Sequence, residues 1–489
     1  MTPAEFDALA REGYNRIPVV RELTADLDTP LTVWLKLADR PDSYLLESAE
    51  SAERFGRYSI VGLPARRRIR VRGRTLCIEE DGVEVRRWDS GDVLGELKQL
   101  QAVWRVPRLP GLPPFTGGLV GYFGFETLAY IEPRLSKCPP DELGLDDIVL
   151  LESTELVVFD NLKGRLYLIV HADPAEPRAL ARAEAQLDTL THRLRRTGVS
   201  YPEVLDPAAL EESSFKSGFS REGFIAAVRR IQEYILAGDA FQVVPSQRMS
   251  VPFRARALDV YRALRQLNPS PYMYLLNLGH AQIVGSSPEI LVRVQNGNVV
   301  VRPIAGTLPR GASAEEDQRN ADALIADPKE RAEHLMLIDL GRNDVGRVAV
   351  PGTVRVPDQM VVERYSHVMH IVSEVEGTLT PGTDFYDVLK ACFPAGTLSG
   401  APKIRAVEII QELEPVKRGV YGGAVGYINW WGEADQAIAI RTAVISGGQL
   451  HVQAGAGIVA DSDPEREWEE TLAKGRALFR AVAQAVRGI

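Results

Sequence analysis

Short strand-like stretches, several of them alternating between apolar and polar residues, dominate the first two hundred residues. Residues 69–72 and 166–170 are two examples, and turn-forming clusters such as the proline- and glycine-rich residues 110–114 separate such stretches. Alternation places the apolar side chains of a strand on one face, where they can be buried together. This part of the chain is predicted to form a mainly antiparallel sheet with some helices.

The pattern changes in the middle of the chain. A charged, helix-like stretch, residues 178–196, leads into polar, proline-bearing residues 201–216, and apolar residues then recur at helical spacing from Phe224. We interpret the polar segment as a boundary between two parts, residues 1–200 and 215–489.

The second part contains further strand-like stretches with helices between them. They are predicted at residues 272–278, 289–294, 299–303, 423–430, 436–445 and 449–454. Many are joined by short turns and only some by helices, which favours an α+β fold over a doubly wound parallel sheet.

Composition narrows the class of protein. The 489 residues are 45% hydrophobic, enough to bury a large core, and 66 acidic against 57 basic side chains give a net charge of −9. A negative chain repels phosphates, so we expect a small-molecule substrate and no nucleic acid. Three scattered cysteines indicate neither disulfides nor a zinc site. Without a signal-like start or a long apolar run, we expect a cytoplasmic protein without membrane contact.

Two helix starts share one arrangement of carboxylates. Residues 327–328 and 463–464 are Asp-Pro pairs, which suit the cap and the first turn of a helix. Two glutamates three residues apart follow each start: Glu330 with Glu333, and Glu467 with Glu470. Each pair lies on one helix face, and two such faces across a cavity would favour a hard cation such as Mg²⁺. A solvated helix face would explain either pair equally well.

Two glycine-rich runs suggest close approach of the backbone to a ligand. Gly455, Ala456 and Gly457 imitate a dinucleotide fingerprint, but the following helix starts too late to meet a pyrophosphate. Residues 396–403 lack the spacing of a phosphate loop. The nucleotide interpretation therefore fails, although either run could hold a carboxylate or form an ordinary turn.

Three isolated side chains are candidates for catalysis or ligand binding. Glu289 stands at the start of a predicted strand, His370 alternates with apolar neighbours, and Arg441 lies in the predicted strand 437–445. A buried arginine needs an anionic partner, which could be a substrate carboxylate or a structural acid. The histidine and the glutamate each have an ordinary alternative, as a core residue and a turn residue.

Longer segments of the sequence resemble those of a known family. Residues 45–48, 302–307, 333–340 and 394–403 resemble the chorismate-utilising enzymes, and within them the branch of anthranilate synthase large subunits. The resemblance spans nearly the whole chain. It implies a large antiparallel-sheet sandwich with flanking helices, built from an N-terminal regulatory half and a C-terminal chorismate-binding half.

The resemblance also implies roles for individual residues. Glu333 and Glu470 match direct Mg²⁺ ligands, and Glu330 and Glu467 match ligands acting through water. Substrate-binding positions are matched by Gly306, Thr307, Tyr421, Arg441, Gly455, Ala456 and Gly457. Thr397, Lys474 and Gln242 line the same site, Glu289 matches the acid that protonates the departing oxygen, and His370 matches the group that removes a proton in the second step.

Two positions separate the relatives within the family. Aminodeoxychorismate synthases typically carry a nucleophilic lysine where this chain has Ala305, and alanine cannot form a covalent adduct. Enzymes that add water to chorismate typically carry a lysine base where this chain has Gln242. The resemblance therefore implies that ammonia is the reactant and that the products are anthranilate and pyruvate.

Partners and regulation follow from the same resemblance. No cysteine stands in the Gly-x-Cys-x-Gly setting of a glutaminase, so a separate glutamine amidotransferase subunit is expected to supply ammonia. Feedback inhibition by L-tryptophan is implied by a second set of matching residues: Glu47, Ser48, Pro271, Tyr272 and Met273. Two alternatives stay open: aminodeoxychorismate synthesis without the lysine, and a catalytically silent tryptophan-binding protein of the same fold.

Overall fold

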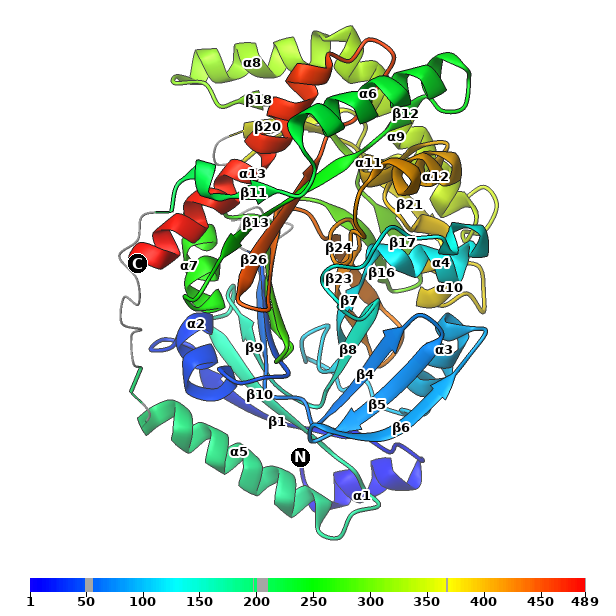
Figure 1. Cartoon of the computed structure of the whole chain (residues 1–489). Coiled ribbons are helices and arrows are strands. Elements are labelled where there is room, and N and C mark those ends of the chain that lie inside the picture. The colour runs from blue at the N-terminus through cyan, green and yellow to red at the C-terminus, as the bar shows by residue number, and fades with distance from the viewer. Residues whose placement is uncertain (49–55, 197, 200–209, 366–367, 489) are drawn as a thin grey trace.

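Two large antiparallel sheets face each other in this computed structural model, which describes residues 1–48, 56–196, 198–199, 210–365 and 368–488 (Figure 1). In the described part of the chain, one sheet has 11 strands and the other has 10. In spatial order the larger sheet contains β1 (Ile17–Thr24), β10 (Arg165–Ala172), β9 (Glu155–Asp160), β3 (Tyr58–Gly62), β2 (Ser43–Glu47), β14 (Tyr272–Asn277), β15 (Ala281–Ser287), β25 (Thr442–Ser446), β26 (Gln449–Gly455), β13 (Ser246–Pro252) and β11 (Lys216–Ser217). The smaller contains β21 (Val375–Thr378), β17 (Asn298–Val301), β16 (Ile290–Gln295), β24 (Ala434–Ile438), β23 (Ala424–Asn429), β7 (Gly118–Phe123), β8 (Ile148–Ser153), β4 (Arg67–Arg72), β5 (Thr75–Glu80) and β6 (Val83–Asp89).

Both sheets mix strands from the two predicted halves. Strand β2 pairs with β14 in the larger sheet, and β7 pairs with β23 in the smaller one. The polar segment predicted as a boundary falls largely on residues 200–209, which lie outside the described residues. The halves are therefore joined by continuous backbone hydrogen bonding in each sheet.

The facing surfaces of the sheets enclose an apolar core. Tyr44 and Tyr274 from the larger sheet and Tyr122 from the smaller one are among its fully buried side chains. Their hydroxyl groups are bonded inside the core: Tyr44 to Ser153 at 2.5 Å, Tyr274 to Thr442 and Tyr122 to a backbone carbonyl. Burial of such large rings is thus compatible with satisfied polar atoms.

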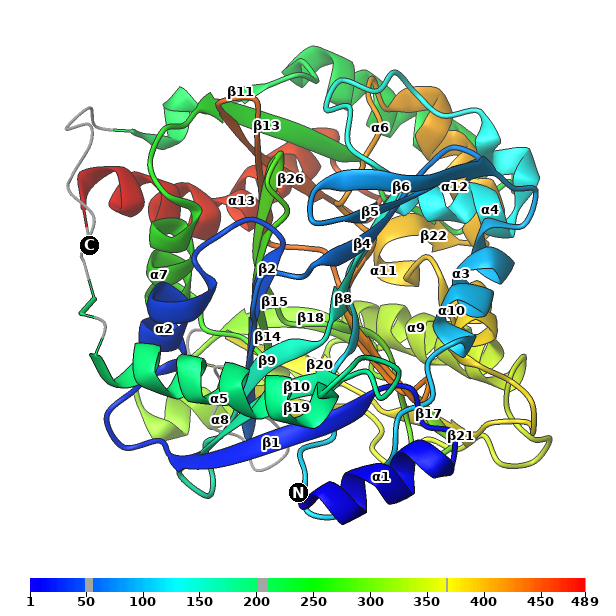
Figure 2. The ribbon, with the colours of Figure 1, turned by 90° about the horizontal axis from the view of Figure 1, so that it is seen from below.

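Helices cover the outer surface of each sheet, which gives four layers (Figures 1 and 2). The larger sheet is covered by α1 (Pro3–Arg11), α2 (Pro30–Val33), α5 (Ala179–Arg196), α7 (Ala257–Leu267) and α13 (Pro464–Arg487). The smaller sheet is covered by α3 (Val93–Ala102), α4 (Leu128–Ile131), α9 (Pro328–Gly346), α10 (Phe385–Cys392) and α12 (Lys403–Leu413). This arrangement confirms the predicted α+β class. None of the helices in the described ranges combines the length and the apolar composition that a bilayer crossing requires.

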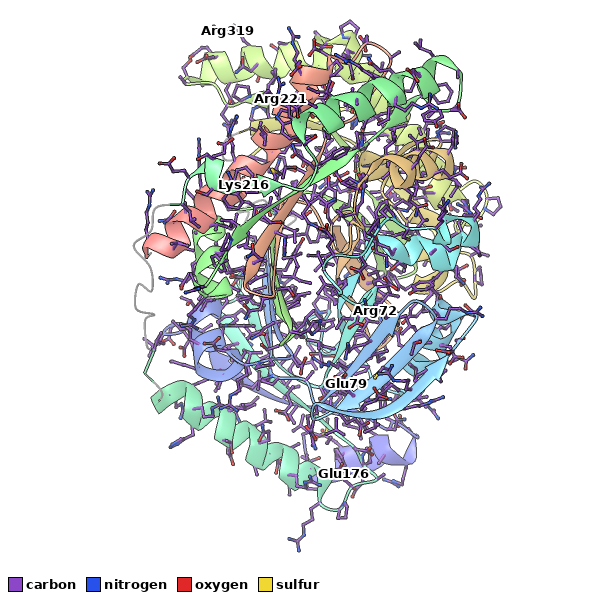
Figure 3. The ribbon with its side chains drawn as sticks, in the orientation of Figure 1. Arg72, Glu79, Glu176, Lys216, Arg221 and Arg319 are labelled. Atoms are coloured by element: carbon purple, nitrogen blue, oxygen red, sulfur yellow. The ribbon has the colours of Figure 1, made fainter. Side chains whose placement is uncertain are left out.

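Smaller elements gather at one end of the sandwich, near α8. Figure 3 shows Arg319, on α8, and Glu176, just before α5, at opposite ends of the molecule. The elements at the α8 end are α6 (Arg221–Leu236), α8 (Ala314–Ala326), α11 (Gly396–Ser399), the pair β12 (Gln242–Val243) and β22 (Gly400–Ala401), and the three-stranded sheet of β18 (Ile304–Pro309), β20 (Val368–Val372) and β19 (Val361–Arg364). Most candidate side chains lie on or beside these elements.

One sequence prediction is wrong at the point where the chain changes sheets. Residues 436–445 were expected to form one strand, but β24 ends at Ile438 in the smaller sheet and β25 begins at Thr442 in the larger one. Arg441 lies between them with φ of 48°, a conformation that interrupts a strand. Its side chain therefore leaves the chain at a crossover and not from a continuous strand.

Candidate active site

The two Asp-Pro starts form the helix caps that the sequence predicts. The Asp327 side chain accepts hydrogen bonds from the first backbone amides of α9, and the Asp463 side chain does the same for α13. Each cap fixes where its helix begins. Both helices therefore present a pair of glutamates in the first two turns.

The two glutamate pairs lie close enough to influence each other. Burial raises the pKa of Glu330, and the charges of Glu333 and Glu470 raise it further. Burial likewise raises the pKa of Glu467, with a contribution from Glu470. A carboxylate on α9 is thus electrostatically coupled to one on α13, so the two pairs lie near each other, although the Glu470 side chain is 47% exposed.

Other side chains engage two of these carboxylates. Lys474 forms an ion pair with Glu470 at 2.8 Å and donates to the Gly455 carbonyl at 3.0 Å, and the Gln242 amide lies 3.4 Å from Glu333. Among the described residues, no three acidic, histidine or cysteine side chains converge on one point. Carboxylate oxygens that repel one another are suitable ligands for a hard divalent cation. Such a cation would have to compete with Lys474 for Glu470.

Glu289 is a buried acid held by one hydroxyl group. Its side chain is 7% exposed, and the Thr397 hydroxyl donates to Oε1 at 3.1 Å. Burial raises the pKa of Glu289 to about 8, although Thr397, Arg441 and Lys474 each oppose that rise. The carboxyl group is therefore mostly protonated at neutral pH and can donate a proton. Glu289 and Thr397 line a small cavity of about 50 Å³.

Arg441 presents a guanidinium group toward this acid. Burial lowers its pKa, and the charge of Glu289 opposes the decrease. Within the described residues its guanidinium forms no hydrogen bond or ion pair. Because a guanidinium group is suited to pair with a carboxylate, this side chain provides a site for an anionic ligand.

Within the described residues, one ring nitrogen of His370 has hydrogen-bond partners and the other has none. Its Nδ1 lies 2.7 Å from the Gly306 carbonyl and 3.1 Å from the Thr307 hydroxyl. A carbonyl only accepts, so Nδ1 carries the proton and Nε2 keeps its lone pair. Burial lowers the pKa of His370, which keeps the ring neutral. The side chain is thus prepared to accept a proton at Nε2.

Small residues bring backbone close to these groups. A Cβ atom at Gly455 would lie 3.0 Å from the Tyr421 hydroxyl, and one at Gly457 would lie 2.6 Å from the Gln242 amide. Gly306, with φ of 63°, leaves room beside Glu330. Glycine is favoured at Gly455, where a Cβ atom would also lie 2.7 Å from the Pro245 carbonyl oxygen, and at Gly306 because of its positive φ, whereas the flexible end of Gln242 could move away from a Cβ atom at Gly457.

The predicted catalytic and substrate-binding residues therefore surround one region. Contacts or electrostatic coupling connect the following residues: Gln242, Glu289, Gly306, Thr307, Glu330, Glu333, His370, Thr397, Tyr421, Arg441, Gly455, Gly457, Glu467, Glu470 and Lys474. Ala456 is buried between the two glycines.

The second set of predicted residues lines a separate cavity between the sheets. This inter-sheet cavity has a volume of about 320 Å³ and contains all five residues matched by the sequence: Glu47, Ser48, Pro271, Tyr272 and Met273. Phe115 and Tyr427 provide aromatic walls, with ring centroids 4.5 Å apart. The volume and the walls suit an aromatic ligand.

Polar groups of the inter-sheet cavity are partly arranged before any ligand binds. The Ser48 hydroxyl is buried without a hydrogen-bond partner among the described residues. Asp435 pairs with Arg293 at 3.0 Å and accepts from the Tyr272 hydroxyl at 2.9 Å. A buried hydroxyl without a partner is costly, and a polar ligand would satisfy it.

Sequence reasoning missed several residues that organise these sites. Arg293 and Asp435 of the inter-sheet cavity lie opposite each other on β16 and β24, and the sequence does not show that these two strands pair. Glu414 and Arg418 form a fully buried ion pair beside the active-site segments, at 2.6 Å. Their spacing of four residues is common on exposed helices, so it gave no signal of burial.

Comparison with known proteins gives a consistent result over the whole chain. A sequence model described as chorismate binding enzyme matches residues 44–480. The chain is 58% identical to anthranilate synthase component 1 of Pseudomonas aeruginosa, with 100% of both chains covered. It is 46% identical to the protein of the same name from Aquifex aeolicus, over 96% of this chain and 95% of that one.

Solved structures agree with the fold. The crystal structure of anthranilate synthase component I from Streptococcus pneumoniae superimposes with a TM-score of 0.78 at 38% identity, covering 88% of this chain and 93% of that chain. The menaquinone-specific isochorismate synthase from Escherichia coli gives 0.71 at 19% identity, covering 98% and 99%, which supports the fold alone.

Proposed function

Because the chain belongs to the chorismate binding enzyme family, we propose that it is the large component of an anthranilate synthase. It converts chorismate and ammonia to anthranilate and pyruvate, the first committed step of tryptophan biosynthesis. The observation that carries this proposal is the buried Glu289, whose pKa burial raises to about 8, near an Arg441 guanidinium that has no hydrogen-bond partner among the described residues, in a chain that matches component 1 proteins over its full length.

The first step needs an acid and an anion site. Arg441 and the backbone of residues 455–457 bind the carboxylates of chorismate, and Tyr421 packs beside them. Ammonia then forms a bond to ring carbon 2 while the bond from carbon 4 to its hydroxyl oxygen breaks. Glu289 donates the proton that lets this oxygen leave as water.

The second step needs a base. His370 accepts the proton from carbon 2 at Nε2, while its Nδ1 stays bonded to the Gly306 carbonyl. The bond between ring carbon 3 and the ether oxygen breaks, and the ring becomes aromatic. The leaving group is the enolate of pyruvate, which becomes pyruvate when its methylene carbon takes up a proton. A neutral imidazole is the form that this step requires, which agrees with the lowered pKa.

Gln242 and Ala305 favour ammonia as the nucleophile. The Gln242 side chain reaches into the site but has no basic nitrogen with which to activate water. Ala305 is buried in β18 and carries no nucleophile. Ammonia needs no such activation because it is itself nucleophilic.

A Mg²⁺ ion fits the facing carboxylates. Glu333 and Glu470 would bind it directly, and Glu330 and Glu467 would bind it through water. When bound, the ion would fix and polarise one carboxylate of the substrate.

A separate glutamine amidotransferase subunit supplies the ammonia. A glutaminase needs an activated thiolate, whereas burial raises the pKa of Cys77 and Cys138 to about 11 and that of Cys392 to about 12. None of these thiols is ionised at neutral pH. Ammonium salts should therefore replace the partner in an assay.

The inter-sheet cavity is proposed to bind L-tryptophan as a feedback inhibitor. Its aromatic walls fit an indole, and the Ser48 hydroxyl, which has no hydrogen-bond partner among the described residues, offers a hydrogen bond to the amino-acid end. Because strands of both halves line the cavity, a ligand there can favour one arrangement of the active site over another.

One experiment tests the enzymatic proposal. Purified protein is incubated with chorismate, ammonium and Mg²⁺, and product formation is followed by anthranilate fluorescence and chromatography. Anthranilate and pyruvate in equal amounts are expected. A 4-amino product would indicate aminodeoxychorismate synthesis. Intact chorismate, together with tryptophan binding in a separate titration, would indicate a silent regulatory protein. Either result overturns the proposal.

A further inference from the structure

Arg418 is a charged side chain buried among the segments that carry the active site. It is 3% exposed, and its partner Glu414 is 5% exposed. Its Nε and one terminal nitrogen donate to the Glu414 carboxylate at 2.6 to 3.2 Å. The ion pair thus fixes one edge of the guanidinium group and leaves the other donors directed elsewhere.

Those other donors reach two backbone carbonyls that are far apart in sequence. One terminal nitrogen donates to the Leu398 carbonyl at 2.7 Å, and the other donates to the Val244 carbonyl at 2.7 Å. Leu398 directly follows Thr397, and Val244 lies two residues after Gln242. One guanidinium group therefore connects the segments that carry two of the proposed active-site side chains.

Aromatic contacts and the partner acid extend this network. The guanidinium carbon lies 5.6 Å from the ring centroid of Tyr421 and 4.5 Å from that of Phe125. Glu414 accepts from the backbone amide of Ser246 at 2.7 Å and from its hydroxyl at 2.8 Å. Ser246 pairs with Gly455 across the neighbouring strands. The network thus touches the glycine turn as well.

The first half of the chain holds the backbone of Arg418 in place. The buried Glu126 carboxylate accepts from the backbone amides of Arg418 and Gly419, each at 3.1 Å. Arg418 is therefore held at both ends: Glu126 holds its main chain, and Glu414 holds its guanidinium group.

A buried ion pair has an ordinary explanation as a packing feature. Such pairs contribute little net stability, because desolvation offsets their attraction. The geometry goes further here, since planar donors point at two carbonyls from different active-site segments. An ammonium group or an apolar side chain could fill the space but could not hold both carbonyls at fixed separation.

We propose that Arg418 is a positioning residue for the reaction. By holding the Leu398 and Val244 carbonyls, it fixes the Thr397 hydroxyl against Glu289 and the Gln242 amide beside the glycine turn. This inference rests on the proposed function, because Thr397 and Glu289 must act on chorismate for their alignment to matter.

Arg418→Lys is the primary test. The variant keeps the charge and loses the planar donors, so we expect kcat with chorismate and ammonium to fall about 100-fold. The pH profile gives a second readout that packing alone would not move. Loss of the Thr397 hydrogen bond removes a contact that lowers the pKa of Glu289, so the alkaline limb of kcat/KM should move to higher pH.

Three further variants calibrate these readouts. Thr397→Val should move the alkaline limb in the same direction. Glu414→Gln weakens the ion pair but keeps an acceptor. Its main effect should therefore be a lower melting temperature, with only a small decrease in rate. Arg67→Lys alters a partly buried ion pair with Glu152, between strands of the first half, and should leave the alkaline limb of kcat/KM in place.

Poor folding of Arg418→Lys would not end the test. The double variant Arg418→Gln with Glu414→Gln removes both charges, which avoids an unpaired buried ion, and should show the same loss of rate and the same shift of the limb. Rates that fall only in proportion to the melting temperature, with unshifted limbs, would overturn the proposal. An inactive wild-type protein would instead refute the proposed function.

Discussion

The hydroxyl of Thr397 donates to Oε1 of Glu289 at 3.1 Å, across a separation of 108 residues in sequence. A donated hydrogen bond favours the ionised carboxylate, whereas burial favours the neutral acid. Burial is the stronger effect, so the pKa of Glu289 rises to about 8. The pair thus provides an acid that is mostly protonated at neutral pH and still able to give up its proton.

The first prediction concerns pH. Because Glu289 must be protonated to act, kcat/KM should fall as the pH rises through about 8. Thr397→Val should move this fall to higher pH and lower kcat about 10-fold or more. Steady-state rates from pH 6 to 10 provide the measurement; an unmoved limb would show that another group controls it.

The second prediction concerns stability. Between about pH 4.5 and 8 the folded Glu289 keeps a proton that the unfolded chain loses, so this residue costs about 1.4 kcal/mol of stability per pH unit. Glu289→Gln should abolish activity. The free energy of unfolding of this variant, relative to that of the wild type, should increase from pH 5 to pH 8. Urea unfolding at both values measures the gain, and parallel stability curves would contradict it.

The third prediction separates the two faces of α13. Glu470→Gln should weaken Mg²⁺ binding by about 100-fold and remove activity. Glu469→Gln, at the next exposed residue on another face of the helix, is the matched control and should bind Mg²⁺ like the wild type. Calorimetric titration with Mg²⁺ and chorismate reports binding independently of turnover. Full activity with excess chelator would discard the metal site.

The fourth prediction uses the tautomer of His370. Asparagine can still donate to the Gly306 carbonyl but provides no base in place of Nε2. His370→Asn should therefore complete the addition of ammonia and stop before pyruvate is lost, so that an amino-substituted intermediate accumulates. Chromatography with mass detection identifies it. Anthranilate formation at the wild-type rate would remove His370 from the second step.

The fifth prediction concerns the inter-sheet cavity. Ser48→Ala removes a buried hydroxyl that has no partner among the described residues, so tryptophan should bind about 5- to 10-fold more weakly. The protein without ligand should become slightly more stable for the same reason. Titration calorimetry and thermal unfolding measure the two effects, and unchanged affinity would mean that the hydroxyl does not meet the ligand.

Local features of the chain could be predicted from its sequence because they depend on neighbours a few residues apart. The Asp327 and Asp463 caps fixed the starts of α9 and α13, and the three-residue spacing placed Glu330 and Glu333 on one helix face. The strand-like stretches and the α+β class follow from the same short-range patterns. Family resemblance then supplied roles that spacing alone could not assign.

Only the tertiary structure decided which of these pieces meet. Alternation in residues 436–445 reports that the side chains are buried but not that the chain leaves one sheet for another, so the turn at Arg441 was missed. The coupling of Glu330 to Glu470 and the contacts of Arg418 with the Val244 and Leu398 carbonyls join residues more than a hundred positions apart or on separate segments. Such contacts arise when two sheets and their helices pack around a common core, and no short-range pattern in the sequence encodes that packing.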